Sequence, residues 1–181
     1  PNGDNSDSYY DGVCDNKDPH KVADVCGVNY SSYSDELKWA YLYAYVKGIT
    51  TQCPISAANL DGYLHRDELA KMISVYAINV VWREPNYGKA WCDKFNDISK
   101  DVPELQEYMK LACELELMWM HADWVTPKAS FDPYSIVTRA EFGTVFSRLL
   151  FGEMYNVKDE SQVYKQEWYR YKAHLQALKD Y

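Results

Sequence analysis

The sequence lacks a long hydrophobic run and a surplus of positive charge, and each absence excludes a class of protein. No apolar stretch in the 181 residues approaches the roughly 18 residues of a membrane-spanning helix, so we expect no transmembrane segment. The chain has 19 Lys and Arg residues against 27 Asp and Glu residues, a formal net charge of −8. Because nucleic-acid binding relies on Lys and Arg to neutralise phosphates, we expect no nucleic-acid partner.

Recognisable catalytic motifs are missing as well. The sequence contains no HExxH, no GxSxG and no glycine-rich phosphate loop, and its 4 histidines are dispersed. Glu114 and Glu116 are close in sequence, but this spacing puts them on different faces of a helix, where they form no acid/base pair. We therefore expect that the protein is not an enzyme.

The 5 cysteines include neither a CxxC pair nor a Cys/His cluster with zinc-finger spacing. We therefore expect disulfides formed in an oxidising compartment, no metal site, and an exported chain. The sequence has no initiator methionine and no signal-peptide hydrophobic region, which fits a processed mature chain.

Five cysteines cannot all pair within one chain, and several pairings stay open. Local spacing favours Cys14 with Cys26 and Cys92 with Cys113, because each pair lies within one local unit. Cys53 would then be free or joined to another subunit.

Residues 1–33 are polar and acidic, and we expect them to form an irregular N-terminal arm. The arm carries five aspartates with the hard oxygens that calcium prefers: Asp4, Asp7, Asp11, Asp15 and Asp18. No stretch follows the EF-hand pattern, so a solvated acidic arm is favoured over a calcium site, and we expect no other cofactor.

What the chain does contain is one pattern that occurs twice. Residues 36–49 align without a gap on residues 104–117, and residues 64–69 align on residues 137–142. Because internal repeats reveal architecture more directly than any single residue, the duplication indicates a repeat protein.

The first predicted repeat spans residues 34–82 and contains two helices joined by a loop. Ser34 is the expected N-cap of the first helix and Gly48 its expected C-cap. The second helix is expected to begin near Arg66, with Glu68 in the capping position.

The second predicted repeat spans residues 95–152 and follows the same plan. Pro103 suits the first turn of its first helix. Thr138 and Glu141 have the spacing of a capping box, in which the hydroxyl and the carboxylate accept hydrogen bonds from free backbone N–H groups at a helix start.

Residues 83–94 are predicted to link the two repeats. Residues 153–181 are predicted to form a second linker and the first helix of an incomplete third repeat, in which Ala177 takes the place of Ala44 and Ala112. The expected fold is therefore all-α, with two helix-loop-helix units and the first helix of a third after an irregular arm.

Three motifs of the second repeat occur in a defined order. They are Phe95-Asn96-Asp97-Ile98, Phe131-Asp132-Pro133 and Val137-Thr138-Arg139-Ala140-Glu141-Phe142. In this order and at this spacing they resemble the S-layer homology (SLH) domains, in the variant found in secreted surface proteins of candidate-phyla bacteria. The resemblance covers residues 34–181.

The resemblance implies an extracellular, non-enzymatic protein of the cell surface, built as a prism of helical repeats. In the variant family, one cysteine precedes the unit and another lies in its first helix. Cys92 and Cys113 occupy these places, so the resemblance also implies a disulfide between them.

The family binds cell-wall polysaccharide in grooves between its repeats. Its groove arginine corresponds to Arg66 and Arg139, whose planar fork suits a carboxylate on a sugar. Three aromatic residues of the second repeat are implied candidates for stacking on sugar rings or for packing: Trp119, Trp124 and Tyr134.

Two functions are compatible with these features. The first is a structural subunit of a surface layer, pilus or filament, with other copies of the chain or other surface proteins as partners. The incomplete third repeat, the acidic arm and Cys53 would each make sense there as intersubunit contacts. The alternative is a non-covalent anchor that binds cell-wall polysaccharide.

Overall fold

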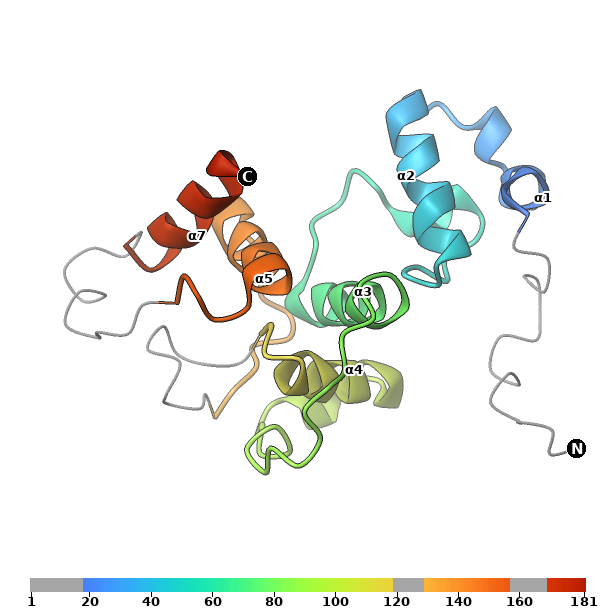
Figure 1. The fold of residues 1–181 in the computed structure, drawn as a ribbon. Helices are drawn as coiled ribbons and strands as arrows, with labels where there is room; N and C mark the ends of the chain where they lie inside the picture. The colour runs from blue at the N-terminus through green and yellow to red at the C-terminus, as the bar shows by residue number, and fades with distance from the viewer. Residues whose placement is uncertain (1–17, 119–128, 157–168) are drawn as a thin grey trace, which may run out of the picture. The chain divides into compact units, whose positions relative to one another are not determined.

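A computed structural model describes residues 18–118, 129–156 and 169–181, which contain six α-helices (Figure 1). Within these ranges there is no strand, and the β pairing is limited to one antiparallel bridge between His65 and Ile136. The expected all-α class is therefore confirmed. None of the helices in the described ranges combines the length and the apolar character needed to span a bilayer.

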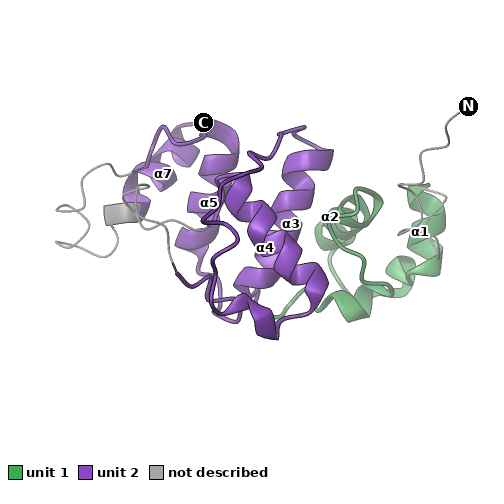
Figure 2. Ribbon diagram, turned by 90° about the horizontal axis from the view of Figure 1, so that it is seen from below, with its two compact units in different colours: residues 1–62 green, residues 63–181 purple. Residues whose placement is uncertain are grey.

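The chain divides into two compact units, residues 1–62 and residues 63–181 (Figure 2). The boundary falls inside the predicted repeat 34–82, so the two helices of that repeat belong to different units. The SLH-like arrangement of repeats remains a prediction.

The first unit contains helices α1 (Pro19–Val25) and α2 (Asp35–Val46), with the short 3-10 turns η2 (Val28–Tyr30) and η3 (Ile55–Ala58). Residues 19–30 were expected to be irregular, and the structure corrects this expectation. Asp18 accepts the N–H of His20 at 2.9 Å and caps a helix that begins with Pro19. The helix then buries Val22 and Ala23 in the core of the unit.

The disulfide of the first unit joins Cys26 to Cys53. The predicted Cys14–Cys26 pair is therefore wrong, and so is the prediction that Cys53 is unpaired. Cys14 lies outside the described residues. Cys53 reaches Cys26 because the N–H of Ile55 donates to the carbonyl of Cys26 at 2.9 Å, which brings two segments that are distant in sequence side by side.

Helix α2 has the expected ends. The hydroxyl of Ser34 accepts the N–H of Leu37 at 3.3 Å, and Gly48 lies just beyond the last turn with φ 71°. A positive φ at this position favours glycine, as at many helix C-termini.

The second unit contains α3 (Arg66–Asn79), η4 (Ile98–Lys100), α4 (Pro103–Glu114), α5 (Arg139–Phe151) and α7 (Tyr169–Asp180). Helix α3 packs on α4, and α5 packs on α7 (Figures 1 and 2). The second turn of α3 lies beside the first turn of α4, where Lys71 Nζ lies 2.7 Å from Glu104 Oε1.

The second unit has the disulfide between Cys92 and Cys113 that the local spacing and the resemblance indicated. Both cysteines are fully buried. The N–H of Asn86 also donates to the carbonyl of Glu114 at 3.0 Å, at the end of α4. Residues of the predicted linker 83–94 therefore pack against α4.

Helix α7 is held on α5 through a buried polar pair. His174 is 1% exposed, and its Nδ1 is hydrogen bonded to Ser147 Oγ at 3.0 Å. Burial lowers the pKa of His174 to about 4, and the positive charge of Arg148 acts in the same direction. The imidazole is therefore neutral at physiological pH.

Candidate functional site

The candidate site of the second unit lies where residues 129–138, here called the crossing segment, pass over the first turn of α3. The backbone N–H groups of Arg66 and Asp67 donate to the carbonyls of Ser135 and Pro133, each at 3.1 Å. The N–H groups at a helix start have no partner within the helix, so these carbonyls satisfy two of them. The crossing segment thus acts as the cap of α3.

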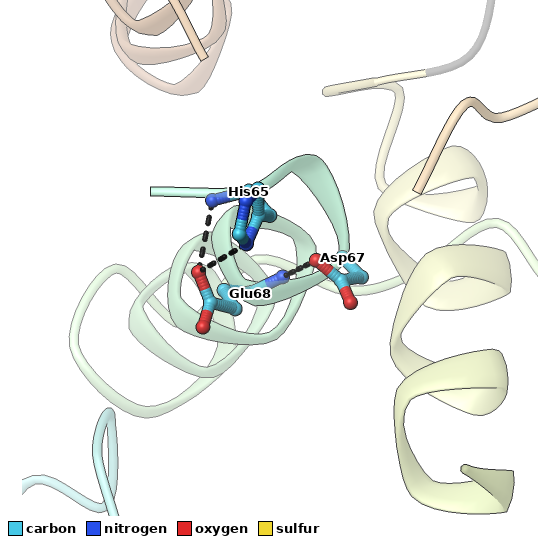
Figure 3. Close-up of side chains that lie close together, drawn as sticks. All are labelled: His65, Asp67 and Glu68. Carbon is cyan, nitrogen blue, oxygen red and sulfur yellow. Dashed lines mark hydrogen bonds and ion pairs between the residues drawn. The ribbon is translucent and has the colours of Figure 1, made fainter. Parts of the chain in front are cut away.

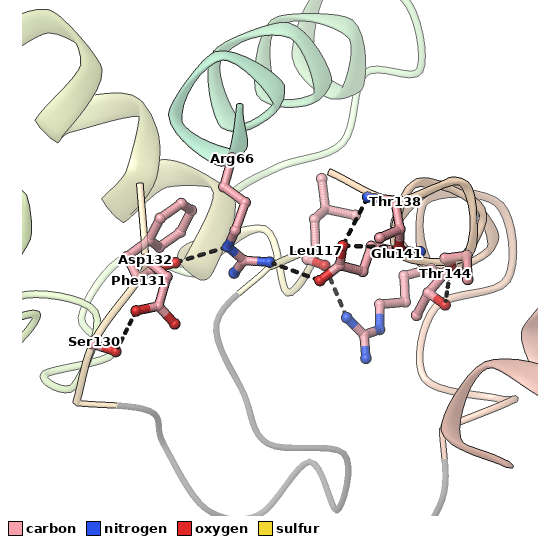
Figure 4. A network of polar contacts seen from close by, with 10 residues as sticks. Arg66, Leu117, Ser130, Phe131, Asp132, Thr138, Glu141 and Thr144 are labelled. Atoms are coloured by element: carbon pink, nitrogen blue, oxygen red, sulfur yellow. Dashed lines mark hydrogen bonds and ion pairs between the residues drawn. The ribbon is translucent and has the colours of Figure 1, made fainter. Parts of the chain in front are cut away.

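Arg66 connects three parts of this site (Figure 4). Its Nε donates to the carbonyl of Phe131 at 2.8 Å, its guanidinium lies 5.2 Å from the centre of the Phe131 ring, and its Nη1 lies 3.9 Å from Glu141 Oε1. The Arg66 side chain is 13% exposed. Much of its hydrogen-bonding capacity is therefore used within the unit.

Asp97 holds the start of the crossing segment. Its two carboxylate oxygens accept the N–H groups of Phe131 and Asp132 at 2.9 and 2.8 Å. Asp132 has φ 58°, in the left-handed region, so the turn needs such support. The sequence motif contained Asp97, but nothing in its spacing indicated this role, because the partners lie 34 and 35 residues away.

Two carboxyl groups meet beneath the crossing segment. Asp67, in the first turn of α3, is 6% exposed, and it lies within hydrogen-bonding reach of Asp101, which precedes α4. Burial raises the pKa of Asp67 above its ordinary value, and the negative charge of Asp101 raises it further.

Tyr134 of the crossing segment is 58% exposed, and its phenol interacts electrostatically with both of these carboxylates. Local desolvation and the charges of Asp101 and Asp67 raise the pKa of its phenol. Tyr134 is one of the three predicted sugar-stacking residues, and its side chain is exposed. Trp119 and Trp124, the other two predicted residues, lie outside the described residues.

The start of α3 also gathers His65, Asp67 and Glu68, each offering one potential ligand atom within 4.8 Å of the others (Figure 3). Their hydrogen bonds explain the cluster without an ion. Glu68 Oε2 accepts the N–H of His65 at 2.8 Å, as expected for a capping residue, and Asp67 Oδ1 accepts the N–H of Glu68 at 2.8 Å. Figure 3 shows an Asp67 oxygen bonded to the backbone N–H of Glu68, and because such hydrogen bonds account for the cluster we assign no metal to it.

Arg139 occupies the first position of α5, directly after the capping box that the sequence predicts. Glu141 Oε2 accepts the N–H of Thr138 at 2.8 Å, and Thr138 Oγ1 accepts the N–H of Glu141 at 3.2 Å. The Arg139 side chain is exposed, and it makes no hydrogen bond or ion pair with the residues that the structure describes. It is the more accessible of the two predicted ligand arginines.

A buried arginine of α5, Arg148, which the sequence did not indicate as important, connects several segments near the site. Arg148 of α5 donates to the carbonyl of Leu117 and to Asn156 Oδ1, each at 3.2 Å, and its own carbonyl accepts from Arg83 Nη1 at 3.0 Å. Burial lowers the pKa of Arg148 to about 9, and the charge of Arg66 acts in the same direction. The burial of Arg148 could not be predicted from its residue type, since most arginines are exposed.

The first unit has a separate hollow of about 480 Å³ between α1 and α2. An exposed aromatic side chain and four polar ones lie around it: Trp39, His20, Asn29, Asp35 and Lys38. Its volume lies within the range of small-molecule sites, roughly 300–1,000 Å³. The sequence did not indicate this hollow, because it is formed by α1 packing on α2 and α1 was not predicted.

In comparisons with known proteins, no family model, no curated protein and no solved structure matches the chain.

Proposed function

We propose that this chain is a structural subunit of an extracellular assembly on a cell surface, such as a layer, pilus or filament. The two disulfides and the absence of a membrane-spanning helix among the described residues are compatible with an extracellular protein. The resemblance to SLH domains supports the same location. The described residues of the candidate site serve mainly to hold elements of the second unit together.

The observation that carries this proposal is the exposure of large aromatic side chains on units whose cores are already closed by disulfides. The most exposed of them among the described residues are Tyr30, Trp39, Tyr63, Trp82, Tyr87, Tyr134 and Tyr181. Aromatic residues are enriched at protein interfaces and contribute strongly there, whereas a monomer gains little from exposing them. Contacts with other subunits would bury them.

The test is to locate the protein in its native source. Surface layers or filaments sheared from cells and washed should contain the chain as a stoichiometric component, measured by mass spectrometry. Tyr30→Ser and Tyr87→Ser should reduce incorporation while leaving thermal unfolding unchanged, and Lys179→Ala, also at an exposed position, is the control. A chain recovered entirely from the soluble fraction would contradict the proposal.

A second function, the polysaccharide anchor, is favoured by one observation. Arg139 is exposed, and its guanidinium has no hydrogen-bond or ion-pair partner among the described residues, as a residue that binds a sugar carboxylate requires. Binding to purified cell-wall sacculi that is lost with Arg139→Ala and retained with Lys179→Ala would support it. Absence of sacculus binding in the unaltered protein would exclude it.

A further inference from the structure

The crossing segment is connected to the carboxyl pair Asp67 and Asp101 through the start of α3. Four hydrogen bonds join the segment to the start of α3, and they link residues 64–67 to residues 131–137. Tyr134, at the middle of the segment, feels the charge of both Asp67 and Asp101. A change in the charge of the pair therefore affects the residues that hold the segment on α3.

The buried oxygen atoms of the pair require a proton. Asp101 Oδ1 accepts the N–H of Val102 at 2.8 Å, but Asp101 Oδ2 is buried and has no hydrogen-bond donor among the described residues. Asp67 Oδ1 accepts the N–H of Glu68, and the two side chains lie within hydrogen-bonding reach. Two carboxylates cannot bond each other unless one is protonated, and a buried oxygen without a donor is costly.

The other charged groups around the pair do not replace this proton. Glu68 on α3 adds negative charge to Asp67, as Asp101 does from the start of α4. One turn further along, Lys71 of α3 is paired with Glu104 of α4. His65 Nδ1 lies 3.6 Å from Glu68 Oε2. The crossing segment contributes Tyr134 and Asp132, and the Asp132 carboxylate accepts a hydrogen bond from Ser130 Oγ at 3.0 Å.

We propose that a proton shared by Asp67 and Asp101 clamps the crossing segment onto the start of α3, and that loss of this proton opens the clamp. Closed, the segment caps α3 and covers the pair. In the open state both carboxylates are ionised and hydrated, and the segment that carries Tyr134 is released from α3. This makes the exposed face of the second unit responsive to pH.

The direction of the response follows from the carboxyl chemistry. The closed state binds the proton more tightly than the open state, because the pKa of Asp67 is raised above 3.8 when it is buried. The closed state is therefore fully stabilised when the pH is below the ordinary pKa of 3.8, and this stabilisation is lost as the pH rises through the raised pKa of Asp67.

Hydrogen exchange at single-residue resolution tests the clamp, because the N–H groups of Arg66 and Asp67 donate to the crossing segment. Their protection factors, corrected for intrinsic exchange, should fall as the pH rises from 3.8 toward neutral, by about tenfold for each unit by which burial raises the pKa of Asp67. Asp67→Asn and Asp101→Asn supply a permanent donor to the pair. In both variants protection should stay nearly constant over this range.

The control is Asp93→Asn, which removes one negative charge from an exposed position of the same unit. It should respond to pH as the unaltered protein does. The proposal is overturned if protection in the unaltered protein does not change with pH, or if both Asn variants lose protection as it does. Should neither variant fold, carboxyl NMR titration of the unaltered protein decides, because two groups that both titrate below about pH 4 share no proton.

Discussion

Arg66 and Arg139 illustrate how much surroundings decide the role of a residue. They occupy equivalent positions of the aligned repeats, and the resemblance gives both the same ligand role. In the structure Arg66 is enclosed by Phe131 and Glu141, whereas Arg139 is exposed. The difference arises from a partner 65 residues away, which no local pattern could reveal.

Arg66→Ala should destabilise the second unit by about 1–3 kcal/mol, because it leaves the carbonyl of Phe131 without its donor and removes the contact with the ring. Urea denaturation followed by tryptophan fluorescence measures this change. Arg139→Ala is the matched control and should alter the free energy of unfolding by less than about 0.5 kcal/mol. Equal effects of the two variants would contradict the structural role of Arg66.

A second prediction concerns Asp97. Asp97→Asn keeps the shape of the side chain but replaces one oxygen by an NH₂ group, which cannot accept the N–H of Phe131 or Asp132. We expect a loss of about 1–3 kcal/mol in the free energy of unfolding and faster exchange of these two amide hydrogens. If both amides remain as protected as in the unaltered protein, Asp97 is not the anchor of the crossing segment.

At the scale of elements, the helices that the repeat pattern marked were predictable, because their caps are local. Ser34, Gly48 and the pair Thr138 and Glu141 act within a few residues of their positions in the sequence. Helix α1 escaped notice because it is short and its burial depends on α2. The crossing segment escaped notice for a similar reason, since its anchors come from residues far away in the chain.

The docking of α7 on α5 should weaken in acid. His174 is buried as a neutral imidazole, and its pKa falls from 6.5 to about 4. The unfolded chain therefore binds more protons between these values, and stability is lost as the pH falls through this window, by about 3 kcal/mol in total.

Thermal unfolding of the unaltered protein and of His174→Gln, measured across this pH window, tests the prediction. The difference in stability between them should shrink as the pH falls, because glutamine does not titrate. His20→Gln changes an exposed histidine of the other unit and serves as the control. A difference that does not vary with pH would show that His174 is not the titrating group.

At the scale of the whole molecule, each unit has its own covalent cross-link. Cys26 pairs with Cys53 in the first unit, and Cys92 pairs with Cys113 in the second. The sequence predicted the second pair correctly because both cysteines belong to one local unit. It failed for the first pair, because Cys53 approaches Cys26 only through the backbone hydrogen bond of Ile55.

Peptide mapping without reduction checks this connectivity. Trypsin should release a disulfide-linked pair of peptides, residues 22–38 and residues 48–66, because cleavage follows Lys21, Lys38, Lys47 and Arg66. The peptide of residues 1–17, which contains Cys14, should not be linked to residues 22–38. A link between those two peptides would instead support the pairing expected from local spacing.

The two disulfides also set how far the chain stretches under load. They join cysteines 27 and 21 residues apart, so together they withhold about 48 residues, or roughly 160 Å of extended chain, from any force applied at the two ends. Pulling single molecules before and after reduction should show this difference in length. An oxidised chain would extend less than a reduced one when its units open, which would suit the proposed role as a subunit of a surface assembly.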